Sequence, residues 1–389
     1  MADDIGVLIV DDSALMRNII GKMVDATPGL AIAEKAMNGI FALRKIPRVN
    51  PDVIVLDLEM PEMNGIEFLK ERKKLGIKIP VVILSSIARR GAETTMEALA
   101  LGASDFIHKP DATVQDLRTV KDVLTDMLLG YGGKYRRSEG KQLPPLDYTK
   151  KMEAAYPISP PPVHSDVSFT RIKTTVSANT LPQGAPAKPL TPLRKPGKIE
   201  IIGIGISTGG PDALRYVFSK LDPDFKTPIV VVQHMPAGFT NEFAKSLDRV
   251  CPMEVKEAEE GDLIKPGRIL IAQGNKHLEV ERRSLAAVVH LSEAPLVSGH
   301  RPSADVLFAS VAKAYTNHAM GVIMTGMGRD GAEQLGSIYK EGGITLGQDE
   351  ASAVVYGMPR VAYELGHVME QIPLDKMASQ ICAITKASR

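Results

Sequence analysis

Tryptophan is missing from this 389-residue sequence, and aromatic residues of every kind make up only 5% of it. Proteins that hold single-stranded nucleic acid stack its bases on aromatic rings, so this composition argues against such a surface. The formal net charge is only +1, which gives no general attraction to DNA or to anionic membranes. We therefore expect no nucleic-acid partner.

Cysteine is scarce as well. The two cysteines, Cys251 and Cys382, are too few for a disulfide framework and lack the spacing of metal ligands. The first residues lead directly into an apolar strand without a basic leader, and no apolar run is long enough to span a bilayer. These absences predict a cytoplasmic protein with no direct membrane insertion.

Proline, in contrast, is concentrated in one central segment. Residues 131–198 hold 11 of the 27 prolines, together with 12 lysines and arginines against 4 acidic residues, a net charge of +8. This composition is typical of an extended or disordered linker, and its charge is better explained by solubility than by nucleic-acid binding. We therefore expect two domains, at residues 1–130 and 199–389, each long enough to bury a full core.

The first domain alternates short apolar runs with helical segments. We expect strands at 5–10, 31–37, 52–56, 81–84 and 105–108, with helices between them and a closing helix at 114–129. Alternation of this kind predicts an α/β fold, a doubly wound parallel sheet.

Polar residues follow these strands. Asp11, Asp12, Asp57, Ser85 and Lys109 stand at the carboxyl ends, where such sheets bind ligands. Three carboxylates in one crevice repel one another unless a hard cation such as Mg²⁺ lies among them, and lysine and serine suit phosphoryl oxygens. Helix capping would explain one of the first two aspartates but not the whole set. The pattern predicts phosphoryl transfer to an aspartate.

This domain resembles the receiver domains of response regulators, which have a flavodoxin-like fold. The matching positions are Asp11-Asp12, Asp57, Met60-Pro61, Gly65, Ser85 and Lys109-Pro110. The resemblance implies that a chemotaxis histidine kinase phosphorylates Asp57. It also implies that Asp11, Asp12, Asp57 and the Glu59 carbonyl hold Mg²⁺, and that Ser85, Phe106 and Lys109 are the switch residues.

The second domain is organised around residues 199–214, an apolar strand followed by a glycine-rich turn and a helix start. Three interpretations compete for this segment. It is a plain strand-to-helix turn, a dinucleotide phosphate site, or a nucleophile elbow that presents Ser207. The dinucleotide fingerprint needs glycine where Thr208 stands. The serine interpretation needs a base and an acid elsewhere in the chain.

Two further strand ends supply them. His234 directly follows an apolar strand at 228–233, and Asp330 lies in the glycine-rich turn after a strand at 321–325. A nucleophile, a base and an acid on one rim of a sheet predict a Ser-His-Asp triad. His300 is the rival base, and we favour His234 because of its place at a strand end. The remaining candidates, expected to be surface or packed residues, are His277, His290, His318 and His367.

This domain resembles the protein-glutamate methylesterase family of bacterial chemotaxis (the CheB family), a Rossmann-like fold. The matching segments are 205–210, 233–240, 298–303, 324–331 and 349–359. The resemblance assigns the triad to Ser207, His234 and Asp330. It places oxyanion contacts at Thr208 and the Met327 backbone, and His300 and Arg301 beside the substrate.

The resemblance also implies the reaction and its control. The expected substrates are methyl-accepting chemotaxis receptors, whose glutamate methyl esters are hydrolysed without a cofactor and whose glutamines are deamidated. The receiver is expected to cover the active site until it is phosphorylated. A flexible linker of this length spans roughly 45 Å, so we expect leaky inhibition. A DNA-binding regulator would need a basic helix-turn-helix, and a binding-only module would not need the triad.

Overall fold

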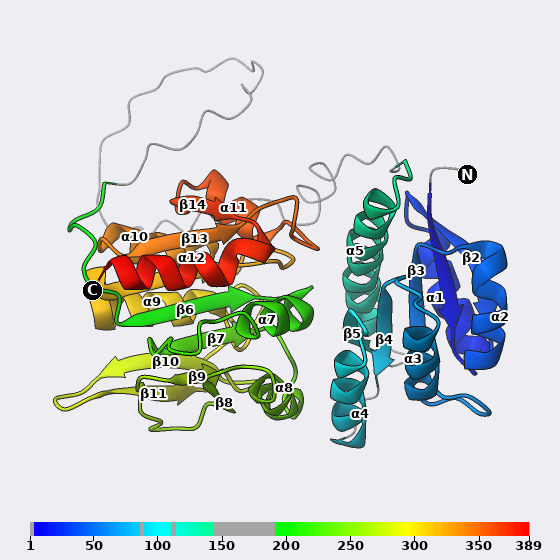
Figure 1. Ribbon diagram of the computed structural model, residues 1–389, viewed down its shortest axis with the longest axis horizontal. Coiled ribbons are helices and arrows are strands. Elements are labelled where there is room, and N and C mark those ends of the chain that lie inside the picture. The colour runs from blue at the N-terminus through cyan, green and yellow to red at the C-terminus, as the bar shows by residue number, and fades with distance from the viewer. Residues whose placement is uncertain (1–3, 86–88, 110–113, 143–190, 389) are drawn as a thin grey trace, which may run out of the picture.

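The computed structural model describes residues 4–85, 89–109, 114–142 and 191–388. Most of the predicted linker, residues 143–190, and Pro110 of the Lys109-Pro110 motif lie outside these ranges. The described residues form two α/β units that lie side by side (Figure 1). Within these ranges, no helix has both the length and the apolar character needed to cross a bilayer.

The first unit is a five-stranded sheet with the order β2-β1-β3-β4-β5, and every strand pair is parallel. Its elements are β1 (Ile5–Val10), α1 (Ala14–Asp25), β2 (Leu30–Ala36), α2 (Gly39–Val49), β3 (Val53–Asp57), α3 (Gly65–Lys74), β4 (Val81–Ser85), α4 (Arg89–Ala100), β5 (Asp105–His108) and α5 (Val114–Ser138). The predicted doubly wound sheet is confirmed, with each strand close to its expected range.

Helix α5 is longer than predicted. It continues past Leu129 to Ser138, into the segment expected to be linker. Tyr131 packs into the apolar cluster between α5 and the sheet, and the Arg136 guanidinium forms a buried ion pair of 3.1 Å with Asp52. The predicted end of the helix at Leu129 was wrong because the contacts of Tyr131 and Arg136 with distant parts of the chain hold the last part of the helix. The local sequence, which contains glycine and several charged residues, gives no sign of these contacts.

The second unit is a seven-stranded parallel sheet with the order β14-β13-β12-β6-β7-β9-β8. Its elements are β6 (Ile201–Ile206), α7 (Gly210–Phe218), β7 (Ile229–Gln233), α8 (Phe239–Asp248), β8 (Glu254–Glu257), β9 (Arg268–Ile271), β10 (His277–Arg282), β11 (Ala287–Ser292), α9 (Ala304–Tyr315), η1 (Thr316–His318), β12 (Ala319–Ile323), α10 (Ala332–Lys340), β13 (Ile344–Gln348), α11 (Met358–Glu364), β14 (Glu370–Ile372) and α12 (Leu374–Ala387). The antiparallel hairpin β10–β11 was not predicted.

Helices cover both faces of this sheet. Apolar side chains of α7, α8 and α12 pack with one face, and those of α9, α10 and the β10–β11 hairpin pack with the other. Gly205 in β6 allows α9 to approach the sheet closely, because a Cβ atom there would lie 2.7 Å from the Cβ of Ala304. The central strand β6 therefore has glycine at the position where the start of α9 packs against it.

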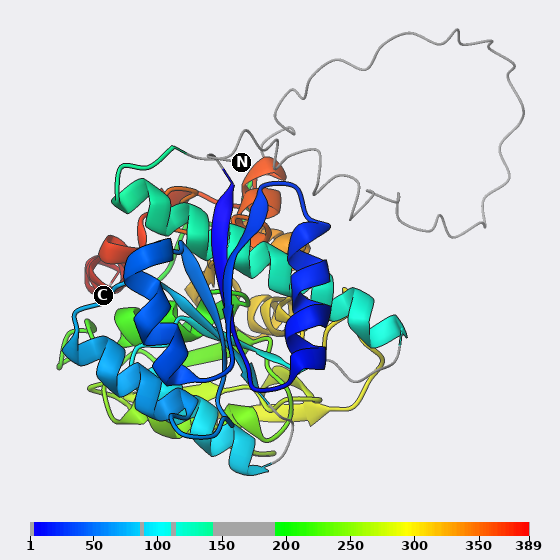
Figure 2. The same cartoon turned by 90° about the vertical axis from the view of Figure 1, so that its right-hand side faces the viewer.

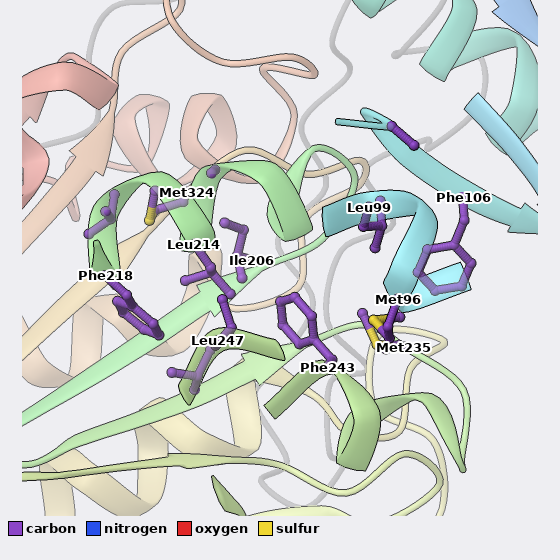
Figure 3. Close-up of a cluster of buried hydrophobic side chains, with 14 of the residues drawn as sticks. Met96, Leu99, Phe106, Ile206, Leu214, Phe218, Met235, Phe243, Leu247 and Met324 are labelled. Carbon is purple, nitrogen blue, oxygen red and sulfur yellow. The ribbon is translucent and has the colours of Figure 1, made fainter. Parts of the chain in front are cut away.

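The two units meet through α4, β5 and α5 of the first and through α7, α8 and nearby loops of the second (Figures 1 and 2). One apolar cluster runs across this contact. It includes Met96, Leu99 and Phe106 from the first unit and Met235 and Phe243 from the second (Figure 3). The first unit thus packs against the same edge at which the strands β6 and β7 end.

Candidate active site and phosphorylation site

Ser207 stands directly after β6, in the turn before α7. Its backbone N–H donates to Thr325 at 3.0 Å, and its carbonyl accepts from the Gly210 N–H at 2.8 Å. The same carbonyl accepts a hydrogen bond of 3.0 Å from the Gln233 side chain, which also donates to the His234 carbonyl at 3.1 Å. Gln233, which sequence reasoning missed, therefore ties the turn of the serine to the strand end that carries the histidine.

His234 and Asp330 are in direct contact. Nε2 of His234 lies 2.7 Å from Oδ2 of Asp330, and the other ring nitrogen, Nδ1, is buried without a hydrogen-bond partner in the described part of the chain. An ionised carboxylate accepts a proton donor, so Nε2 carries the hydrogen and Nδ1 keeps its lone pair. The imidazole is thereby set up as a base through Nδ1.

Asp330 is fully buried but well supplied with donors. Ser303 Oγ donates to its Oδ1 at 2.6 Å, and the backbone N–H of Ala304, the first residue of α9, donates to its Oδ2 at 2.6 Å. Burial alone would raise the pKa of this carboxyl, but the bonds from His234, Ser303 and Ala304 outweigh burial and lower the pKa below its ordinary value. Asp330 is therefore an anion at neutral pH.

His300 lies flat on His234. The ring centroids are 3.8 Å apart and the planes differ by 10°. Burial, with a further contribution from His234, lowers the pKa of His300 to about 4, so this ring is neutral at physiological pH. Ring nitrogens bind metals in the ring plane, and parallel stacked rings direct their lone pairs side by side rather than at one point. The group of His234, His300 and Asp330 therefore does not suit a metal ion in this arrangement.

A cavity of about 220 Å³ joins these residues. The second unit contributes Ser207, Thr208, His234, His300 and Met327 to its wall, while the first unit contributes residues of β5 and α5. Thus Ser207 and His234 face one space, with Thr208 and Met327 beside them. Arg301 is not part of this wall. Its guanidinium binds the Asn275 side chain and the carbonyls of residues 293 and 294, and so fastens a loop.

Asp105 of β5 reaches directly into the turn behind Ser207. Its carboxylate accepts a hydrogen bond of 2.7 Å from the backbone N–H of Gly209 and one of 3.3 Å from the Tyr131 hydroxyl. Burial raises the pKa of Asp105 to about 7 despite these bonds, and Asp212 in the first turn of α7 adds to the effect. The bond joins the two units two residues from the candidate nucleophile.

An aromatic contact lies next to it. Phe106 stacks on Phe239 at the start of α8, with centroids 5.1 Å apart and an interplanar angle of 9°. The His108 ring packs edge-on against the same phenylalanine at 5.1 Å. The residue predicted as the switch aromatic of the first unit is therefore part of the contact with the second unit.

The predicted phosphorylation site is assembled at the carboxyl end of the first sheet. Carboxylate oxygens of Asp11, Asp12 and Asp57 lie within 4.8 Å of one another, and Nζ of Lys109 lies 2.6 Å from Oδ2 of Asp57. Burial raises the pKa of both Asp11 and Asp57, and Lys109 opposes this. An oxygen donor set of this kind, with two buried carboxylates, fits Mg²⁺.

The predicted switch hydroxyl has a partner that sequence reasoning missed. Ser85 Oγ and Thr95 Oγ1 are 2.6 Å apart, and the Thr95 hydroxyl also lies 2.6 Å from the Gly91 carbonyl within α4. Helix α4 packs on α8 of the second unit. A short path of contacts therefore runs from the predicted phosphorylation site to the contact between the units.

Comparison with known proteins gives a separate match for each of the two units. Residues 202–381 match the family model of the CheB methylesterase, and residues 7–120 match that of the response regulator receiver domain. A protein from Treponema denticola is 60% identical over 380 residues, which are 97% of this chain and 98% of that protein. One from Treponema pallidum is 52% identical over 397 residues. Both are named protein-glutamate methylesterase/protein-glutamine glutaminase.

Two solved structures from Thermotoga maritima are also similar. The CheB methylesterase catalytic domain is 35% identical, covers 48% of this chain and 98% of that one, and has a TM-score of 0.47. The response regulator domain of CheB is 38% identical, covers 33% of this chain and 97% of that one, and has a TM-score of 0.31.

Proposed function

Because this chain belongs to the CheB family of protein-glutamate methylesterases/protein-glutamine glutaminases, with a receiver domain in front of the catalytic domain, we propose that it hydrolyses glutamate γ-methyl esters on chemotaxis receptors. The products are glutamate and methanol, and receptor glutamines are deamidated at the same site. The reaction takes place in the cytoplasm. The observation that carries the proposal is the His234–Asp330 bond of 2.7 Å beside the turn of Ser207.

In the first step, the Ser207 hydroxyl attacks the ester carbonyl and its proton passes to Nδ1 of His234. The resulting imidazolium is stabilised by Asp330, which accepts the Nε2–H. The tetrahedral intermediate then expels methoxide, which takes the proton from His234 and leaves as methanol. An acyl-enzyme on Ser207 remains.

In the second step, His234 removes a proton from a water molecule that attacks the acyl-enzyme. Collapse of the second tetrahedral intermediate returns the proton to Ser207 and releases glutamate. With a glutamine substrate the same steps release ammonia in place of methanol. Thr208 and Met327, two residues that border the cavity, stabilise the oxyanion in both steps, Met327 through its backbone N–H. No cofactor is needed for this chemistry.

The receiver domain inhibits the unphosphorylated enzyme. A cavity of about 220 Å³ accepts a single side chain, whereas a helix with its side chains is roughly 10–12 Å across. A helical receptor segment therefore reaches Ser207 only after β5 and α5 move away from the turn of Gly209. Inhibition by docking follows from this difference in size.

Phosphorylation by a histidine kinase reverses the docking. Asp11, Asp12, Asp57 and the Glu59 carbonyl would hold Mg²⁺, which supplies positive charge to the phosphoryl oxygens. A phosphoryl group on Asp57 attracts the hydroxyl of Ser85 away from Thr95 and so shifts α4 and the neighbouring aromatic ring of β5. The contacts of Asp105 with Gly209 and of Phe106 with Phe239 are then weakened.

A serine-directed phosphonate probe tests the proposal, with the labelled residue identified by mass spectrometry. We expect labelling of Ser207, faster labelling when a small phosphodonor is present, and slower labelling when methylated receptor membranes compete. A module that only binds ligands would leave Ser207 unlabelled. Labelling that methylated membranes do not slow would argue for a hydrolase with another substrate.

A further inference from the structure

The ring of His300 is held by a tight turn of unusual composition. The backbone groups of Val297 and His300 bond each other at 3.1 and 2.9 Å, and the two residues between them have positive φ angles, 52° at Ser298 and 80° at Gly299. Glycine adopts such angles freely, whereas serine does so at a cost. A serine in the first of these positions suggests that its side chain has a task.

Ser298 makes two bonds that fix the neighbouring ring. Its Oγ donates to Oδ2 of Asp305 at 3.1 Å, and its carbonyl accepts from Nδ1 of His300 at 2.8 Å. The second bond sets the tautomer of His300, and the first anchors the whole turn to α9. The position of the ring on His234 therefore depends on a carboxylate that does not touch the triad histidine.

Asp305 holds α9 and α10 together at the same time. Its Oδ1 accepts the backbone N–H of Gln334 in the first turn of α10 at 3.0 Å. Asp330, which precedes α10, in turn accepts the N–H groups of Ala304 and Asp305 in the first turn of α9. Each helix start is thus capped by the aspartate of the other. Asp305 is buried, with 9% of its surface exposed.

We propose that Asp305 is a positioning residue for the esterase reaction, which fixes the Val297–His300 turn through Ser298 and so keeps the neutral His300 ring stacked on His234. The inference rests on the proposed function of His234 as the base. His234 becomes a cation when it takes the proton of Ser207, and an aromatic face at 3.8 Å stabilises a cation. Asp305 acts on this step indirectly, through the Val297–His300 turn.

The charge of Asp305 adds to the effect. Burial, with a further contribution from Asp330, raises the pKa of Asp305 to about 6, and the N–H groups of Gln334 and Gly331 and the Ser298 hydroxyl oppose this shift. The carboxylate is therefore ionised above that pH, when the esterase would operate. Ionised Asp305 is a second buried anion near the His234–Asp330 pair, and its negative charge also stabilises the protonated form of His234.

The test compares Ser298→Ala, Asp305→Asn and the double variant with the wild type, all as the full chain treated with a phosphodonor. We expect Ser298→Ala to lower kcat for methanol release about three- to thirtyfold with KM within twofold, the range of one cation–π contact. In the pH profile of kcat/KM, the acid limb should move to lower pH, because protonated His234 loses the stacked His300 ring that stabilises it. The double variant should be no worse than Asp305→Asn.

Two controls separate this role from general destabilisation. Ser298→Gly removes the hydroxyl but relieves the positive φ, so it should match Ser298→Ala if the bond matters and the wild type if only strain matters. Ser337→Ala removes a comparable hydrogen bond of 2.7 Å to Gln334 on α10 and should leave kcat unchanged. An unmoved acid limb, or additive losses in the double variant, would overturn the inference.

Histidine NMR of the same proteins gives a readout that does not need turnover. Stacked rings shift each other's protons upfield, and we expect that shift to disappear from His234 and His300 in Ser298→Ala and Asp305→Asn. Unchanged ring shifts in both variants would refute the positioning role. If the wild type releases no methanol while the ring shifts respond as expected, the proposed reaction fails and the positioning of His300 stands.

Discussion

Phe239 offers the sharpest test of docking between the domains. It stacks on Phe106 and meets His108 edge-on, each at 5.1 Å. The variant Phe239→Leu keeps most of the apolar area but removes both aromatic pairs. Such pairs contribute about 0.5–1.5 kcal/mol each beyond burial, so we expect docking to weaken by about 1–2 kcal/mol after partial repacking, a factor of about 5–30.

The assay is the ratio of methanol release without a phosphodonor to release with one. Under the proposed mechanism the phosphorylated enzyme is undocked in both proteins, so the ratio cancels any direct effect of the variant on the chemistry. We expect this ratio to rise about 5- to 30-fold in Phe239→Leu, up to a limit of one. Phe218→Leu is the matched control, because Phe218 is equally buried but lies at the far end of α7, away from the receiver.

An unchanged ratio in Phe239→Leu would refute the claim that this aromatic contact holds the receiver over the active site. An equal rise in Phe218→Leu would mean that loosening of the catalytic domain, and not loss of the contact with Phe106, produces the effect.

Three further predictions concern the triad, the phosphorylation site and pH. Asp330→Asn should lower kcat by about three to four orders of magnitude with little change in KM, because the imidazole loses its orienting anion. Asp57→Asn should keep the basal rate of methanol release and lose all stimulation by a phosphodonor. Burial raises the pKa of Asp105 to about 7 in the docked structure, and release of the receiver would expose this carboxyl, so docking favours its protonated form and is weakened as pH rises toward 7. The ratio of unphosphorylated to phosphorylated methanol release should therefore increase between about pH 5 and pH 7 and should change less in Asp105→Asn.

Much of the fold could be predicted from the sequence, because parallel strands buried on both faces leave continuous apolar runs. The runs ending at Asp11, Asp57 and His234 were placed within a residue or two. The β10–β11 hairpin was missed because its strands are partly exposed toward their carboxyl ends and β10 contains charged residues, so neither strand is a continuous apolar run. The extension of α5 was missed because Tyr131 and Arg136 hold it through distant partners.

Only those residues of the candidate site that lie at or shortly after the carboxyl ends of strands could be predicted from the sequence. Parallel strands bring Ser207 and His234 to one rim, and the register pairs Ile206 with Gln233 directly before them. Other contacts depend on loops and on the docking of the receiver domain. They are the stacking of His300 on His234, the hydrogen bonds of the Gln233 side chain to the Ser207 and His234 carbonyls, and the hydrogen bond from Gly209 to Asp105. Local sequence patterns carry no signal for contacts of that kind.

The central claim is that Ser207 carries the acyl group of a receptor glutamate. Methanol release from methylated receptor membranes tests it most directly, for the wild type and Ser207→Ala, each with and without a phosphodonor. We expect release by the wild type that increases with the phosphodonor, and a loss of several orders of magnitude in Ser207→Ala. Release by Ser207→Ala at the rate of the wild type would contradict the account.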